Sequence, residues 1–289
     1  MLREPGRLTG DVTDKHWPHE PSSIPRTGAP VHPGITQLSD ALPRDRIQLG
    51  RAAPAKPQSF MPPWDYKTST TGYYDRHAAE FCENTFTVDV SALYVPFLRE
   101  IPEGGAILDA GCGSGRDSLA FLRRGYRVVS IDASPEMVAA ATKHAGQQTL
   151  LLTFDEIDFT DEFDGIWACG SLVHVARRDL HSVFTRFSRA LKPNGVIYLS
   201  FKYGHSERME GERFFNDMNE AALGLFLGGH PELELTHLWI AEDLRNRARG
   251  YQNVLNALVR RKAISEIPRE APAQAPLQHS GDEPVDRAE

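Results

Sequence analysis

The feature that most constrains the fold is a short apolar run that leads directly into glycines. Residues Ala106 to Asp109 have the composition of a buried strand, and Gly111, Gly113 and Gly115 follow at alternate positions. A helical pattern then begins at Asp117. Glycines between a strand and a helix let the backbone approach a ligand with no side chain between them. The sequence therefore predicts a nucleotide-like ligand at this turn.

Strand and helix patterns alternate through the middle of the chain. Strands are predicted at 106–109, 127–131, 149–153, 163–168 and 196–200. Helices are predicted at 73–83, 90–100, 117–124, 135–144, 178–191 and 217–227, and two final strands, which can pair antiparallel, at 232–240 and 252–260. This alternation predicts a parallel sheet with helices on both faces.

The two ends of the chain differ in composition from its middle. Residues 1–63 hold more than half of the 20 prolines and few large apolar side chains, which predicts a disordered arm. Residues 263–289 have the same character and predict a loose tail. One folded domain is expected between them, at 64–262.

The glycine spacing separates two classes of cofactor. A dinucleotide-binding turn has the pattern G-x-G-x-x-G, but Arg116 stands where its third glycine would be. Asp109 adds a negative charge where a pyrophosphate needs room. A cofactor that carries an ammonium and a sulfonium suits this turn better. A nicotinamide oxidoreductase is therefore disfavoured, and it ranks third among the alternative functions.

Several stretches resemble the class I S-adenosylmethionine-dependent methyltransferases, in the order found in that family. The run ILDAGCGSG at 107–115 is similar to the family's first motif, and residues 163–168 resemble its fourth strand. Residues 191–200 resemble the turn and fifth strand usually written LkPGG, from which Asn194 departs. The likeness covers about residues 72–261. It implies a Rossmann-like, doubly wound, seven-stranded sheet, mostly parallel with one antiparallel strand, and S-adenosylmethionine as cofactor.

The resemblance also implies which residues hold the cofactor. Asp132, at the end of the second strand, would accept hydrogen bonds from both ribose hydroxyls. Met137 would lie near the adenine, and Asp155 would contact the adenine amino group, with Glu156 as the alternative. Met137 as core packing and Asp155 as a loop or cap acid remain open. The expected set is Asp109, Gly111, Cys112, Gly113, Gly115, Asp132, Ala133, Met137 and Asp155.

Methyl transfer from a sulfonium is a direct displacement, so no covalent nucleophile is needed. His174 follows the fourth strand, at the sheet edge where ligands bind in such folds, and is a candidate general base. A structural histidine that caps the next helix is the alternative.

Two further segments hold candidates for acceptor contacts. Tyr73 and Tyr74 lie on a helix that precedes the core, which in relatives often forms a lid. Past the fifth strand, many relatives build acceptor contacts from the segment that here holds Lys202, Tyr203, His205 and Arg213. Ordinary surface roles remain open for both segments.

Charge and cysteine content limit which kinds of ligand and partner are expected. A net charge of -7 and a pI near 5.9 disfavour a surface built to neutralise many phosphates. Cys82, Cys112 and Cys169 lack metal-ligand spacing and are expected to be reduced, with no metal bound. No apolar stretch is long enough for a membrane span, so a cytoplasmic location is expected.

The sequence thus predicts an enzyme that methylates a small-molecule acceptor. Within the family, the run around Ser171 and His174 looks similar to tellurite-resistance and thiopurine-type enzymes. An RNA methyltransferase, as in tRNA-modifying relatives, is the first alternative. A regulatory protein that binds the cofactor without turnover is the second. The acceptor and the oligomeric state do not follow from the sequence.

Overall fold

The computed structural model describes residues 65–243 and 253–263. The predicted arm at 1–63 lies outside these ranges, as does the predicted tail apart from Ala263. Both domain boundaries therefore stay predictions. Within the described residues, no helix has the length and apolar character needed to cross a membrane.

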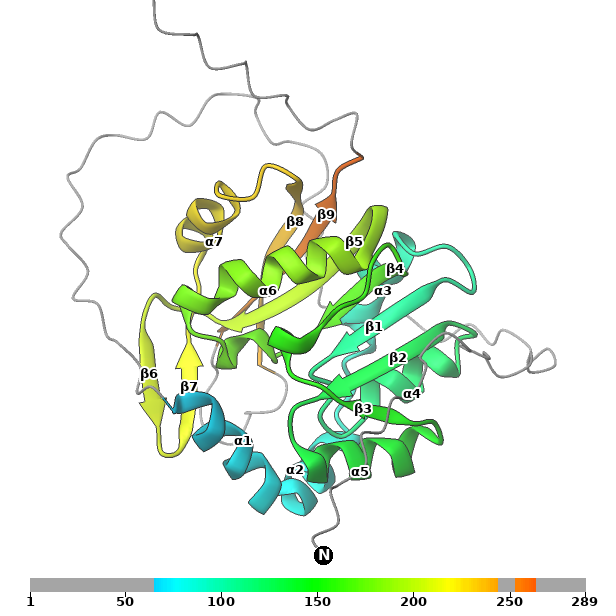
Figure 1. Cartoon of the computed structure of the whole chain (residues 1–289), viewed down its shortest axis with the longest axis vertical. Helices are drawn as coiled ribbons and strands as arrows, with labels where there is room; N and C mark the ends of the chain where they lie inside the picture. The colour runs from blue at the N-terminus through cyan, green and yellow to red at the C-terminus, as the bar shows by residue number, and fades with distance from the viewer. Residues whose placement is uncertain (1–64, 244–252, 264–289) are drawn as a thin grey trace, which may run out of the picture. The chain divides into compact units, whose positions relative to one another are not determined.

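The elements follow one another largely as the patterns predict (Figure 1). The helices are α1 (Tyr66–Arg76), α2 (Ala78–Phe86), α3 (Ser91–Arg99), α4 (Arg116–Leu122), α5 (Pro135–Ala145), α6 (Arg177–Ala190) and α7 (Glu220–Leu227). Two short 3₁₀ helices, η1 (Phe154–Glu156) and η2 (Leu172–His174), follow β3 and β4. The strands are β1 (Ala106–Ala110), β2 (Arg127–Asp132), β3 (Thr149–Leu151), β4 (Phe163–Ala168), β5 (Leu191–Lys202), β6 (Glu207–Glu210), β7 (Arg213–Asn216), β8 (Leu233–Glu242) and β9 (Asn253–Arg261).

Seven strands form one sheet in the order β3-β2-β1-β4-β5-β9-β8. The first five strands pair in parallel, and β9 runs antiparallel to both of its neighbours, β5 and β8. The chain starts in the middle of the sheet, extends to β3, and then returns to fill the other side from β4. This confirms the predicted doubly wound sheet with one antiparallel strand.

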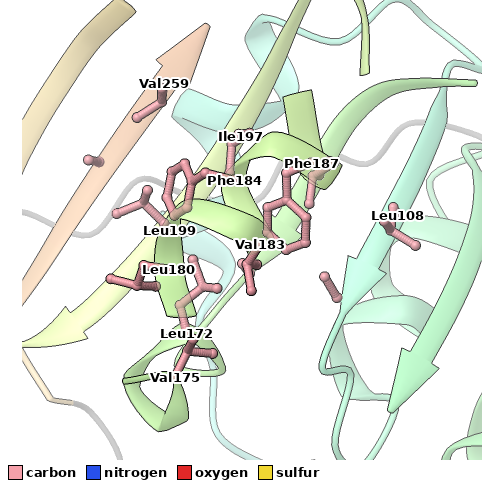
Figure 2. Close-up of a cluster of buried hydrophobic side chains, with 14 of the residues drawn as sticks. Leu108, Leu172, Val175, Leu180, Val183, Phe184, Phe187, Ile197, Leu199 and Val259 are labelled. Atoms are coloured by element: carbon pink, nitrogen blue, oxygen red, sulfur yellow. The ribbon is translucent and has the colours of Figure 1, made fainter. Parts of the chain in front are cut away.

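Alternate residues of the central strands belong to two hydrophobic cores on opposite faces of the sheet. Leu108 packs with the apolar side of α6, including Phe184 and Phe187, as Figure 2 shows. Its neighbour Ile107 faces the other way and packs with Trp167 and the aromatic residues of α3 and α4. Because successive side chains of a strand point to opposite faces, a strand buried on both sides must be apolar throughout.

The α5 helix has the ends that its sequence predicts. The Ser134 hydroxyl accepts a hydrogen bond from the Met137 amide at 3.2 Å, and Pro135 occupies the first turn. At the other end, Gly146 takes a left-handed conformation with φ 71°. These local signals place the helix at the end of β2, where Asp132 lies.

The predicted helix at 73–83 is wrong in its bounds, since two helices occupy this region. The first begins earlier because Tyr66 is buried against Phe214 and Ala176, which lie far away in sequence. The helices separate at His77, whose ring stacks on Tyr73 and bonds to the Tyr73 carbonyl at 2.8 Å. Long-range packing therefore determines where these helices begin and end.

The hairpin of β6 and β7 has no counterpart among the predicted elements. Its strands are four residues each, and they turn at Gly211 with φ 61°. Phe214 and Phe215 alternate between the two faces of β7, and both are buried by other elements. The hairpin lies beside α1 (Figure 1). Four-residue strands carry too little pattern to be identified by period alone.

Candidate active site

A pocket opens at the carboxyl ends of β1, β2 and β4. The glycine turn after β1 forms its floor, and residues after β2 and β4 form two sides. Parts of α1 and α2 and the segment after β3 line the rest of the pocket. The lining includes Thr70, Thr71, Tyr74, Phe81, Thr85, Asp109, Gly111, Cys112, Gly113, Ser114, Asp132, Ala133, Met137, Phe154, Ser171 and His174.

The glycine turn places bare backbone against the pocket. Gly111 has φ 76°, and a Cβ atom there would lie 2.5 Å from the Cβ of Ser171. A Cβ at Gly113 would lie 3.3 Å from the ring of Phe81. Side chains at either position would therefore strain the backbone and fill the space that a ligand needs.

Asp132 ties the glycine turn to the start of α5. Its carboxylate accepts hydrogen bonds from the Gly113 amide at 2.8 Å and from the Ser134 amide at 2.9 Å. Burial raises the pKa of this carboxyl, while the backbone donors act in the opposite direction. A carboxylate that also lines the pocket can accept further hydrogen bonds from ligand hydroxyls.

Asp109 is the most deeply buried acid that faces the pocket, at 2% exposure. The Ser118 hydroxyl donates to its carboxylate at 2.6 Å. Burial raises the pKa of Asp109, and the nearby charge of Asp117 raises it further. A cationic ligand would stabilise the ionised form and so be favoured here.

Asp117 lies beside Asp109, but its carboxylate is held by protein groups. It accepts hydrogen bonds from Tyr94, from the Trp167 indole and from the Arg116 guanidinium, at 2.7–3.0 Å. These contacts lower the pKa of Asp117 against the effect of its burial. Asp117 therefore anchors α4. The buried carboxylate of Asp109 has fewer hydrogen-bond donors to stabilise its charge.

The two carboxylates and the glycine turn fit the cofactor that the first motif implies. The buried carboxylate of Asp109 suits an ammonium group, and Asp132 suits a pair of hydroxyls. The bare turn from Gly111 to Gly113 leaves space between them. The fit rests on the chemistry of these groups and on the space that a Cβ atom would fill.

The remaining predicted cofactor residues divide into those at the pocket and those away from it. Cys112, Ala133 and Met137 line the pocket. Gly115 lies outside the lining and packs against α5, where its Cβ would meet the Ala141 backbone at 2.9 Å. Its role in the structure is to let two helices approach.

Asp155 is not part of the pocket wall. Its carboxylate accepts a hydrogen bond from the Lys67 amine at 2.5 Å, and both side chains are about half exposed. Glu156, the alternative, accepts from the backbone and hydroxyl of Thr153 at the start of η1. From this segment it is Leu152, Thr153 and Phe154 that line the pocket.

His174 forms a chain of hydrogen bonds with Tyr74 of α1 and with β7. Its Nδ1 atom lies 2.7 Å from the Phe214 carbonyl, and its Nε2 atom lies 2.8 Å from the Tyr74 hydroxyl. A carbonyl oxygen only accepts, so Nδ1 carries a proton, and in the neutral ring Nε2 accepts from the Tyr74 phenol. Both side chains line the pocket.

The cover helices, α1 and α2, are attached to the rest of the site by side-chain hydrogen bonds. Asp75 accepts from the Ser134 hydroxyl at 2.5 Å, and Thr85 donates to the Ser114 hydroxyl at 3.1 Å. The sequence pattern predicted a helix in this region, but it did not predict the hydrogen bonds to Ser134 and Ser114. Thr70, Thr71, Phe81 and Thr85 are lining residues that sequence reasoning missed.

The structure places Cys82, Cys112 and Cys169 without a disulfide between them, and the reduced state stays a prediction. Cys112 and Cys169 line the pocket, and burial raises the pKa of the Cys112 thiol well above its ordinary value. A neutral thiol is a poor nucleophile, which disfavours covalent chemistry at Cys112. In the described ranges, no group of three His, Cys, Asp or Glu side chains is placed to hold a metal ion.

Comparison with protein families identifies residues 107–195 as a match to the methyltransferase domain model. The matched segment begins in β1 and ends in β5. It therefore includes the glycine turn, Asp132 and His174.

Curated relatives match over the same part of the chain. A glycine/sarcosine N-methyltransferase from Parasynechococcus marenigrum (strain WH8102) is 32% identical over 126 residues, which are 40% of this chain and 44% of that protein. The putative methyltransferase YqeM of Bacillus subtilis (strain 168) is 33% identical over 150 residues, 47% of this chain and 60% of that protein. The chain thus spans about half the length of these relatives.

Solved structures share the fold. A Burkholderia thailandensis 1,6-didemethyltoxoflavin-N1-methyltransferase superposes with a TM-score of 0.57 at 22% sequence identity, covering 71% of this chain and 92% of that protein. That structure contains 1,6-didemethyltoxoflavin and S-adenosylhomocysteine. None of these three relatives is a tellurite-resistance or thiopurine-type enzyme, so that finer resemblance stays a prediction.

Proposed function

We propose that this chain, which carries a class I S-adenosylmethionine-dependent methyltransferase domain, transfers a methyl group to a small-molecule acceptor. One observation carries the proposal of a small acceptor. The cover helices line part of the pocket, and side-chain hydrogen bonds join them to the glycine turn and to β7. A covered pocket admits a small molecule more readily than a polymer.

The residues proposed to hold the cofactor are those at the strand ends. Asp109 would bind its ammonium, Asp132 its ribose hydroxyls, and the turn at Gly111 and Gly113 would contact it through backbone. Bound there, S-adenosylmethionine supplies an electrophilic methyl group on a sulfonium. The protein's part is then to align the acceptor and to remove a proton from it.

We propose that Tyr74 and His174 handle this proton. The acceptor proton passes to the Tyr74 oxygen as the phenol proton passes to Nε2 of His174. The imidazolium that forms keeps its Nδ1 hydrogen bond to the Phe214 carbonyl, which stabilises the positive charge. If the acceptor is already a thiolate, no proton needs to be removed.

A pair of conservative substitutions separates this role from a structural one. His174→Asn keeps a donor near the position of Nδ1, so the bond to the Phe214 carbonyl can persist, while the base is lost. Turnover should fall by about a hundredfold or more, with cofactor affinity unchanged. Tyr74→Phe should give a similar fall. Unchanged turnover in both folded variants would leave His174 as a structural link between η2 and β7.

The acceptor class is tested with methyl-labelled S-adenosylmethionine. The full chain is incubated with the small-molecule fraction of a cell extract and, separately, with its total RNA. Labelled product is then identified by mass spectrometry. Label in the small-molecule fraction that is lost with Asp132→Ala is the expected result. Label in RNA alone favours the RNA alternative, and cofactor binding without any labelled product favours a regulatory protein.

A further inference from the structure

A group of cations surrounds the ring of Phe215, next to the proposed proton-transfer pair. The charged ends of Lys202, Arg208 and Arg213 lie 3.8, 5.4 and 5.1 Å from the centre of this ring. We call these four residues the Phe215 cluster. The Phe215 ring also packs against the ring of His174, with centres 4.9 Å apart.

The acids near the cluster do not balance its charge. Glu210 pairs with both Lys202 and Arg208, and Asp217 pairs with Arg208. Within the described part of the chain, three cations thus share two carboxylates. Burial lowers the pKa of the Lys202 amine, which is the response of a cation whose lost hydration is incompletely replaced.

Arg213 is the cation of the cluster that forms no ion pair within 4 Å among the described residues, although its charge lowers the pKa of Glu210, which lies opposite it in the hairpin. Its guanidinium makes no hydrogen bond or ion pair with any of them, and its Nε atom is buried without a partner there. The guanidinium carbon lies 4.6 Å from the centre of the Tyr73 ring as well as near Phe215. Two aromatic rings therefore hold the group in place.

A stacked guanidinium is well suited to bind an anion. The rings occupy its faces, while its hydrogen-bond donors lie along its edge. Carboxylate and phosphate oxygens match this edge as paired acceptors. Holding the group in advance also reduces the ordering entropy lost when the anion binds.

Arg213 does not line the pocket itself. It lies over the rings of Tyr73 and Phe215, which contact the rings of two lining residues, Tyr74 and His174. Tyr73 precedes Tyr74 on α1, and their rings are 5.6 Å apart. Arg213 precedes Phe214, whose carbonyl holds His174. An acceptor that reaches from Arg213 into the pocket would extend toward the Tyr74 and His174 side chains.

We propose that the acceptor carries an anionic group, a carboxylate or a phosphate, and that Arg213 binds it. This inference rests on the proposed function. It assigns to the hairpin of β6 and β7 the selection of the acceptor, while the turn after β1 holds the cofactor. Lys202 and Arg208 contribute to the positive potential but remain paired with acids.

The test measures anion binding directly. The full chain is first titrated with S-adenosylhomocysteine and then, with that compound bound, with benzoate, phenyl phosphate or phenol by calorimetry. At least one of the two anions should bind about tenfold or more tightly than phenol, since a charge-assisted pair contributes roughly this much. The preferred anion identifies the group on the acceptor.

Two variants and a matched control assign the effect to Arg213. Arg213→Gln should weaken binding of the preferred anion about tenfold, with binding of S-adenosylhomocysteine unchanged. Arg213→Lys, which keeps the charge but loses the paired donors, should lie between. Arg178→Gln is the control, because Arg178 also lies over a tyrosine ring, that of Tyr66, but belongs to α6. It should leave anion binding unchanged.

Failure of this inference is distinguishable from failure of the proposed function. If S-adenosylhomocysteine binds but the anions bind no better than phenol, the anion site is wrong and the methyltransferase proposal stands. Equal anion affinity in the parent and in folded Arg213→Gln, with melting temperatures compared, has the same meaning. If S-adenosylhomocysteine does not bind the parent, both proposals fail.

Discussion

At the scale of single residues, Asp132 is the side chain on which the cofactor assignment depends most. Asp132→Ala should weaken cofactor binding, because two charge-assisted hydrogen bonds to vicinal hydroxyls contribute about 2–4 kcal/mol after the hydration of the acid is counted. That range corresponds to about 30-fold to nearly 1,000-fold in Kd. Asp132→Asn should be milder, since its amide oxygen still accepts one bond. Isothermal titration with S-adenosylhomocysteine measures both.

Asp155→Asn serves as the control for that series. Its carboxylate lies outside the pocket wall and bonds to Lys67, so its loss should change cofactor affinity by less than about threefold. A large loss with Asp155→Asn would restore the adenine contact that the sequence motif implies. Equal affinities for the parent and both Asp132 variants would remove Asp132 from the cofactor site.

The raised pKa of Asp109 predicts that the free energy of unfolding depends on pH. Its pKa is raised in the folded, ligand-free protein, chiefly by burial, so the native carboxyl holds a proton that the unfolded chain has released. This group's contribution to stability therefore falls as pH rises from the ordinary carboxyl value to the raised one. The slope is at most about 1.4 kcal/mol per pH unit.

Asp109→Asn should remove that slope. Denaturant unfolding of parent and variant between about pH 5 and pH 7 should show the variant gaining relative to the parent as pH rises. Asp155→Asn, an exposed change, should follow the parent. A difference between Asp109→Asn and parent that stays constant with pH would mean that Asp109 is already ionised in the folded protein.

At the scale of elements, the contact between α4 and α5 depends on a missing side chain. Gly115 has φ 76°, and its Cβ would meet the Ala141 backbone of α5 at 2.9 Å. Gly115→Ala combines left-handed strain of about 1–2 kcal/mol with overpacking of about 1–3 kcal/mol. We expect a loss of about 2–5 kcal/mol in unfolding free energy, measured by denaturant titration.

Gly146→Ala is the matched comparison for this contact. Gly146 has nearly the same φ, 71°, at the C-terminal end of α5, but among the described residues no atom outside its own helix turn and chain neighbours lies within 4 Å of its added Cβ. Only the backbone strain of about 1–2 kcal/mol applies there. If the two variants lose equal stability, the helices separate easily and the close approach at Gly115 contributes little.

At the scale of the whole molecule, we expect the folded unit and the pocket to require only part of the chain. Among the described residues, those that line the pocket come from Thr70 onwards, and the buried Tyr66 begins α1. A chain that starts at Met61 should keep its melting temperature within about 2 °C and its cofactor affinity within about twofold, because the removed segment has few apolar groups to bury. Calorimetry of both forms checks this. A loss of several degrees would show that the removed segment packs.

Local sequence signals account for the central half of the molecule. The glycine turn, the acid that ends β2 and the Ser134-Pro135 start of α5 each follow from neighbouring residues, since strand period, capping and turn chemistry act over a few positions. Alternating strands and helices then imply the doubly wound sheet. The cofactor end of the pocket is built from these elements, so the places of Asp109 and Asp132 follow from the sequence alone.

The acceptor end depends on residues that are far apart in sequence. Tyr74 and His174 are separated by 100 positions, and no periodicity links them. The hairpin of β6 and β7 is too short to show a pattern, yet its Phe214 carbonyl sets the tautomer of His174 and its Arg213 stacks on Tyr73. The sequence by itself thus determined the sheet and the chemistry of the cofactor turn. Only the tertiary structure decided which side chains lie together at the proposed acceptor end, because those contacts arise from packing between elements.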